Sequence, residues 1–96
     1  MTSPTILQAI VRINEHLGVV ADVIRALTSD EMFHREALRA AVRIGYRCLV
    51  EAEVALAQNI EHMTPHGGLY LQARIQLAAT NLGTAVAAYR AAWSST

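Results

Sequence analysis

The feature that most constrains the fold is a run of aliphatic residues near the start of the chain, spaced alternately four and three positions apart. These residues are Ile6, Ile10, Ile13, Leu17, Val20, Ile24 and Leu27. The heptad spacing places all of them on one face of an α-helix, whereas a β-strand would need a period of two. Val11, Val19 and Val23 widen the apolar face, so we predict a helix that packs into a bundle.

Capping residues and helix breakers mark the expected boundaries. Ser3 and Pro4 have the pattern of a helix start, with a capping side chain followed by proline at the first helical position. Thr28 and Glu31 have the spacing of a capping box, which predicts the start of a second helix. That helix is expected to continue to about Met63, where the Thr-Pro and Gly-Gly pairs of residues 64–68 would end it.

The last predicted helix, from about Leu69 to Trp93, is almost free of charge. Its charged residues are Arg74 and Arg90, and alanine is frequent throughout. A helix with so few charges on any side is normally buried all round, which a bundle of three helices does not achieve. We therefore expect this helix to meet a symmetry mate. The residues predicted to form the core or dimer interface are Leu71, Ile75, Ala78, Leu82, Val86, Tyr89 and Trp93.

The composition also indicates more apolar material than one short chain buries. Hydrophobic residues make up 53% of the 96 positions and charged residues 17%, against about 25% charged in soluble domains. A chain of this length forms one domain, residues 1–96, and buries a modest fraction of its surface. We predict an all-α fold in which one N-terminal helix and two long antiparallel helices form a bundle that is completed by dimerisation or a larger assembly.

The charge balance argues against several classes of partner. Eight acidic and eight basic residues give a formal net charge of zero, so the chain as a whole is not attracted to nucleic acid or to a membrane surface. No stretch reaches the roughly 18 uninterrupted apolar residues of a transmembrane helix. Residues 1–4 lack the basic start of a signal peptide, and the single Cys48 forms no internal disulfide. These features predict a cytoplasmic protein.

No arrangement of side chains predicts catalysis or a metal site. Glu31 and His34 form one Glu-x-x-His motif at a helix start, whereas a di-iron bundle needs two such motifs in its core. His62 and His66 have the spacing of a zinc pair, but the helix is expected to break between them. Cys48 has no base at helical spacing and is interpreted as a small packing residue. We predict that the protein is not an enzyme and uses no cofactor or metal.

The strongest candidate for binding is a row of arginines, each four residues after the last. They are Arg35, Arg39, Arg43 and Arg47. On a helix this spacing gives one slanting ridge, in which neighbouring like charges repel by a few tenths of a kcal/mol. The ridge is compatible with a solvated face that forms ion pairs within the bundle, and also with a docking site for an acidic protein surface. Tyr70 and Arg74 complete the set of predicted partner-binding residues.

Three collinear segments resemble the TraM family of quorum-sensing antiactivators from conjugative plasmids. They are Arg25–Met32, Arg47–Glu51 and Tyr70–Leu77. The last resembles the tyrosine-led part of the final helix in that family, and the residue match assigns packing or contact roles to Tyr70, Ala73 and Ile75. The chain departs from the family in a longer first helix and a shorter loop before Tyr70.

The resemblance implies a homodimer that binds a LuxR-type transcription factor and keeps it from DNA. Sequestration would act by shifting the regulator's population toward its DNA-free state. Two alternatives remain open from the sequence. One is a self-assembling helical adaptor, encoded by a phage or a plasmid. The other is an oligomer that holds a small anionic ligand between protomers, with Tyr46, Tyr70 and the arginines around it.

Overall fold

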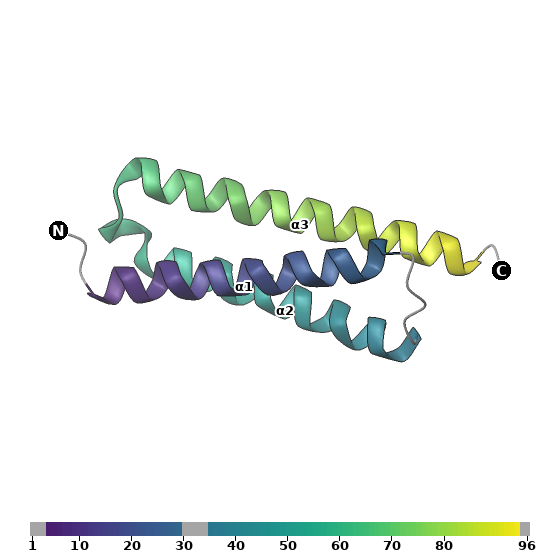
Figure 1. Cartoon of the computed structure of the whole chain (residues 1–96). Coiled ribbons are helices and arrows are strands. Elements are labelled where there is room, and N and C mark those ends of the chain that lie inside the picture. The colour runs from purple at the N-terminus through teal and green to yellow at the C-terminus, as the bar shows by residue number, and fades with distance from the viewer. Residues whose placement is uncertain (1–3, 30–34, 95–96) are drawn as a thin grey trace.

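The computed structural model is a bundle of three long helices, which confirms the predicted all-α fold. The structure describes residues 4–29 and 35–94, and the side chains of residues 5–29 and 35–92. Its elements are α1 (Pro4–Thr28), α2 (Arg35–Asn59), a short 3₁₀ helix η1 (Ile60–His62) and α3 (Pro65–Ser94). No strand occurs among these residues. Successive helices run in opposite directions, so that α1 and α3 are parallel to each other (Figure 1).

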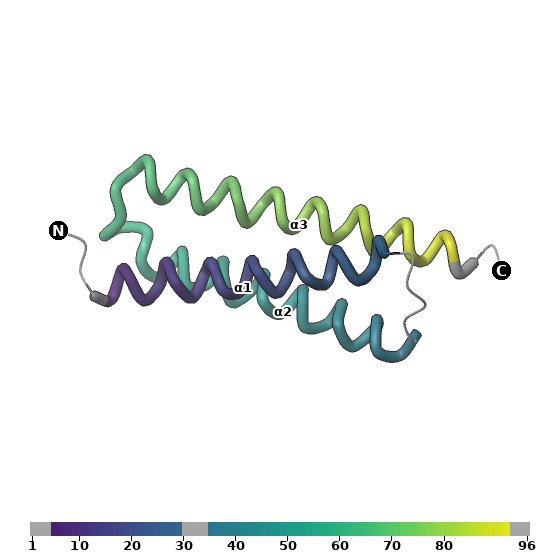
Figure 2. Tube along the Cα trace, in the orientation of Figure 1, coloured from purple at the N-terminus to yellow at the C-terminus, as the bar shows by residue number. Residues whose placement is uncertain are grey.

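The molecule is a rod, because each helix runs along nearly its whole length. It measures 54 × 18 × 18 Å, and a helix with the 30 residues of α3 is itself about 45 Å long. The tube in Figure 2 shows the tight connection from α2 to α3 at one end, near the N-terminus, and the C-terminus at the other. The beginning of α2 therefore lies at the same end of the rod as the end of α3.

The core follows the heptad pattern of the first helix. Ile13 and Val20 are fully buried, Leu17 and Val23 are buried beside them, and Ile10, Ile24 and Leu27 pack against this core. The other helices contribute to the same core Cys48, Leu49, Ala52, Ala55, Leu56, Leu71, Ile75, Leu82 and Val86. Burial of one such aliphatic side chain contributes about 1.5–3 kcal/mol, so this shared core is the main source of stability.

Side chains of both α1 and α3 pack against α2 at Gly45. A Cβ placed on Gly45 would lie 3.2 Å from Leu82 Cδ2 of α3 and 3.6 Å from the Val23 methyl carbons of α1. Leu82 is itself fully buried. Glycine at this position therefore allows α1 and α3 to pack against the same turn of α2.

The predicted capping role of Thr28 is wrong. Thr28 is the last residue of α1, and its hydroxyl donates a hydrogen bond to the Ile24 carbonyl oxygen at 2.9 Å. A threonine can bond forward to cap a new helix or backward to the helix that it ends, and here the backward bond forms. Its proposed capping partner Glu31 lies outside the described residues, as do Ser3 and His34.

The boundary between the last two long helices also differs from the prediction. The α-helical part of α2 ends at Asn59, and α3 begins at Pro65, about one turn earlier than expected. Thr64 caps α3, because its hydroxyl accepts a hydrogen bond of 3.1 Å from the Gly67 N–H. Proline is favoured at the first helical position, where its missing N–H costs nothing. The residues expected to break a helix therefore start one.

Candidate functional site

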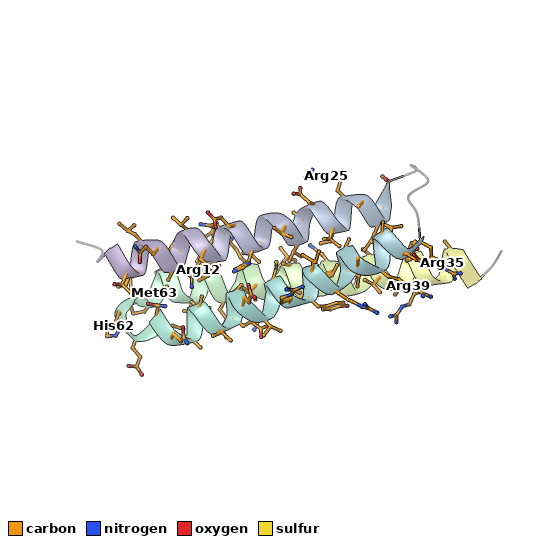
Figure 3. All side chains as sticks on the ribbon, turned by 90° about the horizontal axis from the view of Figure 1, so that it is seen from below. Arg12, Arg25, Arg35, Arg39, His62 and Met63 are labelled. Atoms are coloured by element: carbon orange, nitrogen blue, oxygen red, sulfur yellow. The ribbon has the colours of Figure 1, made fainter. Side chains whose placement is uncertain are left out.

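The arginine ridge forms one wall of a hollow between α2 and α3. Arg35, Arg39 and Arg43 of α2 line it together with Arg90 of α3, and the hollow measures about 510 Å³. The rest of its lining is Val42, Val86 and Tyr89. Figure 3 shows Arg35 and Arg39 at the end of the rod where α2 begins. Since α2 and α3 are antiparallel, this end also receives the last turns of α3, which bring Arg90 to the ridge.

The hollow is lined by positive side chains. Four guanidinium groups line it, and none of the described residues in its lining is acidic. Arginine presents a planar fork of N–H donors that fits a carboxylate or a phosphate, and it stays charged at all physiological pH values. The valines and Tyr89 supply an apolar wall beneath the charges. The arrangement fits an anionic group carried on an apolar body.

The other predicted partner-binding residues do not join this hollow. Arg47 is exposed on α2 and is not part of the lining. Arg74 lies in the half of α3 that is far from Arg90 in sequence, with its guanidinium carbon 5.7 Å from the centre of the Tyr70 ring. Arg74 Nη1 donates a hydrogen bond to Asn14 Oδ1 of α1. The structure therefore divides the predicted set into a basic end on α2 and a separate pair, Tyr70 and Arg74, in the first half of α3.

A second hollow lies further along the boundary between α2 and α3, and the sequence did not predict it. It measures about 360 Å³ and is lined by Glu53, Leu56, Ala57, Ile60, Gln72, Ile75 and Gln76. Between the two hollows α3 carries Gly83, and a Cβ placed there would meet no atom within 4 Å. Gly83 therefore places no side chain on this stretch of α3.

The residues predicted for the core or dimer interface pack largely within one chain. Leu71, Ile75, Leu82 and Val86 are buried, and Ala78 packs against them. Tyr89 is half-buried and lines the basic hollow, while the Trp93 side chain lies outside the described side chains. These positions account for the inner face of α3 and leave its outer face to be explained.

The outer face of α3 carries a second heptad pattern. It runs through Tyr70, Ala73, Leu77, Thr80, Thr84, Ala87 and Ala91, all of which are exposed. The exposed fractions reach 62% for Tyr70 and 61% for Leu77, and Leu69 beside them is 64% exposed. Among the described side chains of α3 the charged residues are Arg74 and Arg90; neither is a member of this line, although the Arg74 guanidinium lies beside it, over the Tyr70 ring. A long exposed helix face without charge is typical of a surface that binds another protein.

The described residues contain no group of three or more histidine, cysteine, aspartate or glutamate side chains that could hold a metal ion. His62 belongs to η1 and His66 to the first turn of α3, so the two do not share a helix. His16 Nε2 of α1 lies 3.2 Å from Glu51 Oε2 of α2, an interhelical contact outside the basic hollow.

Cys48 has the environment of a packing residue. It is buried in the core, and burial raises the pKa of its thiol above the ordinary value. Glu51 raises this pKa further, and Arg47 lowers it. A raised pKa keeps the thiol protonated near neutral pH, whereas the reactive form is the thiolate. This environment agrees with the interpretation of Cys48 as a small side chain between helices.

None of the helices, over the described residues, combines the length and the hydropathy needed to cross a membrane. Comparison of the chain with protein-family models, with curated proteins and with solved structures found no match.

Proposed function

We propose that the protein is a protein-binding module that forms a homodimer and sequesters a regulatory protein, with a LuxR-type transcription factor as the candidate partner. The observation that carries the binding role is the outer face of α3, which is exposed, uncharged and patterned in heptads over most of the helix. The three segments that resemble the TraM family support the choice of partner. In this proposal the protein performs no catalysis and does not itself bind DNA.

The outer face of α3 suits pairing with a second copy of itself. In a twofold dimer the same patch meets itself, so a charged residue near the axis would face an identical charge. The outer line of α3 has no charged residue, and its small residues Ala73, Ala87 and Ala91 allow two helices to approach closely. Leu77 and Tyr70 would supply the apolar contact area. Such an interface would bury side chains that are otherwise more than half exposed.

Sequestration requires that the protein bind the regulator better when DNA is absent. A partner with this preference shifts the regulator's population away from the promoter in proportion to the difference in affinity. The basic end of the rod offers the charge for contact with an acidic surface, and it lies on a different side of α3 from the proposed dimer face. Dimer formation and partner binding are therefore compatible.

The dimer is tested by light scattering on a gel-filtration column. We expect the wild type to elute with twice the 10.5 kDa mass of the chain. Leu77→Arg should elute as a monomer with unchanged helical content, because the side chain is exposed and the substitution leaves the core intact. Val50→Arg on α2 is the matched control, since Val50 is 58% exposed. A monomeric wild type would contradict the dimer.

The choice of partner is tested by a gel-shift assay with a LuxR-type regulator on its operator. Adding the protein should abolish the regulator–operator complex in proportion to the amount added. If the band of the regulator–operator complex keeps its intensity at an excess of the protein, the antiactivator proposal is wrong. The protein would then be a binding module for a different partner.

A further inference from the structure

We infer that the two hollows between α2 and α3 together form one groove that binds an amphipathic helix of the partner protein, with an acidic end on the arginines and an apolar end against Ala57 and Ile75. This inference rests on the proposed protein-binding function and assigns it a site and a partner chemistry. The bound helix would be the fourth helix of the bundle, lying in a groove that the three helices of the chain leave open.

The length of the groove sets the length of the occupant. The basic hollow includes Arg39 and the second hollow includes Ala57, both on α2. These residues are separated by about 27 Å along the helix axis, which is the length of a helix of about 18 residues. Gly83 leaves open space between the two hollows, so one continuous helix can lie over both.

The arginines select an extended array of negative charge. Successive residues of the ridge are four positions apart, which is a rise of about 6 Å along the axis. A single phosphate or carboxylate reaches one or two guanidinium groups, whereas acidic residues four apart on a neighbouring helix repeat with the same rise. Arg90 approaches from α3 and adds a fourth positive charge. The spacing therefore favours an acidic helix over a small anion.

The other end of the groove favours apolar side chains and so determines which end of the occupant carries the acidic residues. Leu56 and Ile75 are buried in its floor, and Ile60 is partly exposed at its edge. The one charged residue in its lining is Glu53, which would repel an acidic segment placed at this end. An occupant with its acidic residues at the arginines and leucine or isoleucine at the far end avoids this repulsion and buries apolar surface.

A different hollow, between α1 and α2, lacks this polarity. It measures about 430 Å³, and its lining mixes Arg12 with Glu15, Glu51 and His16. His16 and Glu51 already contact each other there. Positive and negative groups in one small area do not select either sign of charge, so the α2–α3 groove is the better-defined site.

The test uses fluorescein-labelled synthetic helices of about 18 residues, matched to the groove. Leucine occupies every third or fourth position, glutamate is confined to two turns at one end, and alanine and glutamine fill the rest. Both chain directions are made, because the groove does not fix the direction of the occupant. A control peptide carries glutamine in place of each glutamate. Binding to the full-length protein is followed by fluorescence anisotropy.

We expect one of the acidic peptides to bind and the glutamine control to bind about tenfold more weakly. Arg39→Glu should weaken binding of the acidic peptide by tenfold or more. Arg47→Glu is the matched control, since Arg47 lies on the same helix but outside the hollow, and it should change the affinity less than about twofold. Ala57→Arg should also weaken binding, while Ala40→Arg, at an exposed position of the same helix, should not.

Three results would overturn the inference. The first is no binding of either acidic peptide up to about 100 μM. The second is an Arg39-dependent rise in melting temperature with tripolyphosphate when neither peptide binds, which would make the hollow a small-anion site. The third is a change in oligomeric state caused by Arg39→Glu, which would make the groove an interface between copies of this chain. The Leu77→Arg test of the dimer and the gel-shift test of the partner are separate experiments. Failure of the groove inference can therefore be distinguished from failure of the proposed function.

Discussion

The close approach of the three helices at Gly45 can be measured by adding a single methyl group. Replacement of an exposed mid-helix glycine by alanine normally stabilises a protein by about 1 kcal/mol, because alanine has the higher helix propensity. At Gly45 the new methyl carbon would lie 3.2 Å from Leu82 Cδ2, a contact tighter than carbon atoms prefer. Overpacking of this kind costs about 1–3 kcal/mol. We therefore expect Gly45→Ala to destabilise the protein by up to about 2 kcal/mol.

Gly18→Ala is the matched control for this experiment. Gly18 lies in the middle of α1, and a Cβ placed there meets no atom within 4 Å. The same chemical change should stabilise the protein by about 1 kcal/mol at this position. The difference between the two variants removes the contribution of helix propensity and measures the cost of the contact with Leu82, about 1–3 kcal/mol.

Urea unfolding followed by circular dichroism at 222 nm measures both free energies. All samples are held at one protein concentration, because self-association makes apparent stability depend on concentration. Equal stabilisation by Gly45→Ala and Gly18→Ala would refute the reasoning, since it would mean that the helices have room for a methyl group at their crossing.

Two further predictions concern a cap and a thiol. Thr64→Ala should destabilise the protein by about 1 kcal/mol in urea unfolding, because the Gly67 N–H loses its hydrogen bond to the Thr64 hydroxyl; an unchanged midpoint would contradict the capping role. Cys48 should react with Ellman's reagent far more slowly in the native protein than in urea at pH 8, because it is buried and its pKa is raised. Equal rates in both states would show that the thiol is accessible.

Hydrophobic spacing made the helices and their inner faces predictable from the sequence. The aliphatic residues of α1 were placed on the core side by their alternating steps alone, and Ile13 and Val20 are fully buried as expected. Helix ends were less predictable because threonine can either end a helix or begin one. Thr28 closes a helix through a bond to the preceding turn, and Thr64 opens one through a bond to the following turn.

The candidate surfaces were predictable only in part, because they depend on which helices are neighbours. Four-residue spacing placed Arg35, Arg39 and Arg43 on one stripe, but no spacing in the sequence relates them to Arg90. Their meeting follows from the antiparallel packing of α2 and α3. The outer heptad of α3 was present in the sequence through Tyr70 and Leu77, but it alternates along the same helix with an inner heptad through Leu71 and Ile75, and only the burial of the side chains separates the two.

Salt separates the two proposed surfaces, because one is charged and the other is not. Four arginines line the proposed groove, so its affinity for an acidic peptide should fall as salt shortens the Debye length from about 14 Å at 0.05 M to about 4 Å at 0.5 M. The outer line of α3 carries no charge, so dimer dissociation should be unchanged or weaker in the same titration. Anisotropy of the acidic peptide and light scattering on one sample measure both. A dimer that dissociates with salt in parallel with the peptide would mean that the arginines, and not the face around Leu77, hold the two copies together.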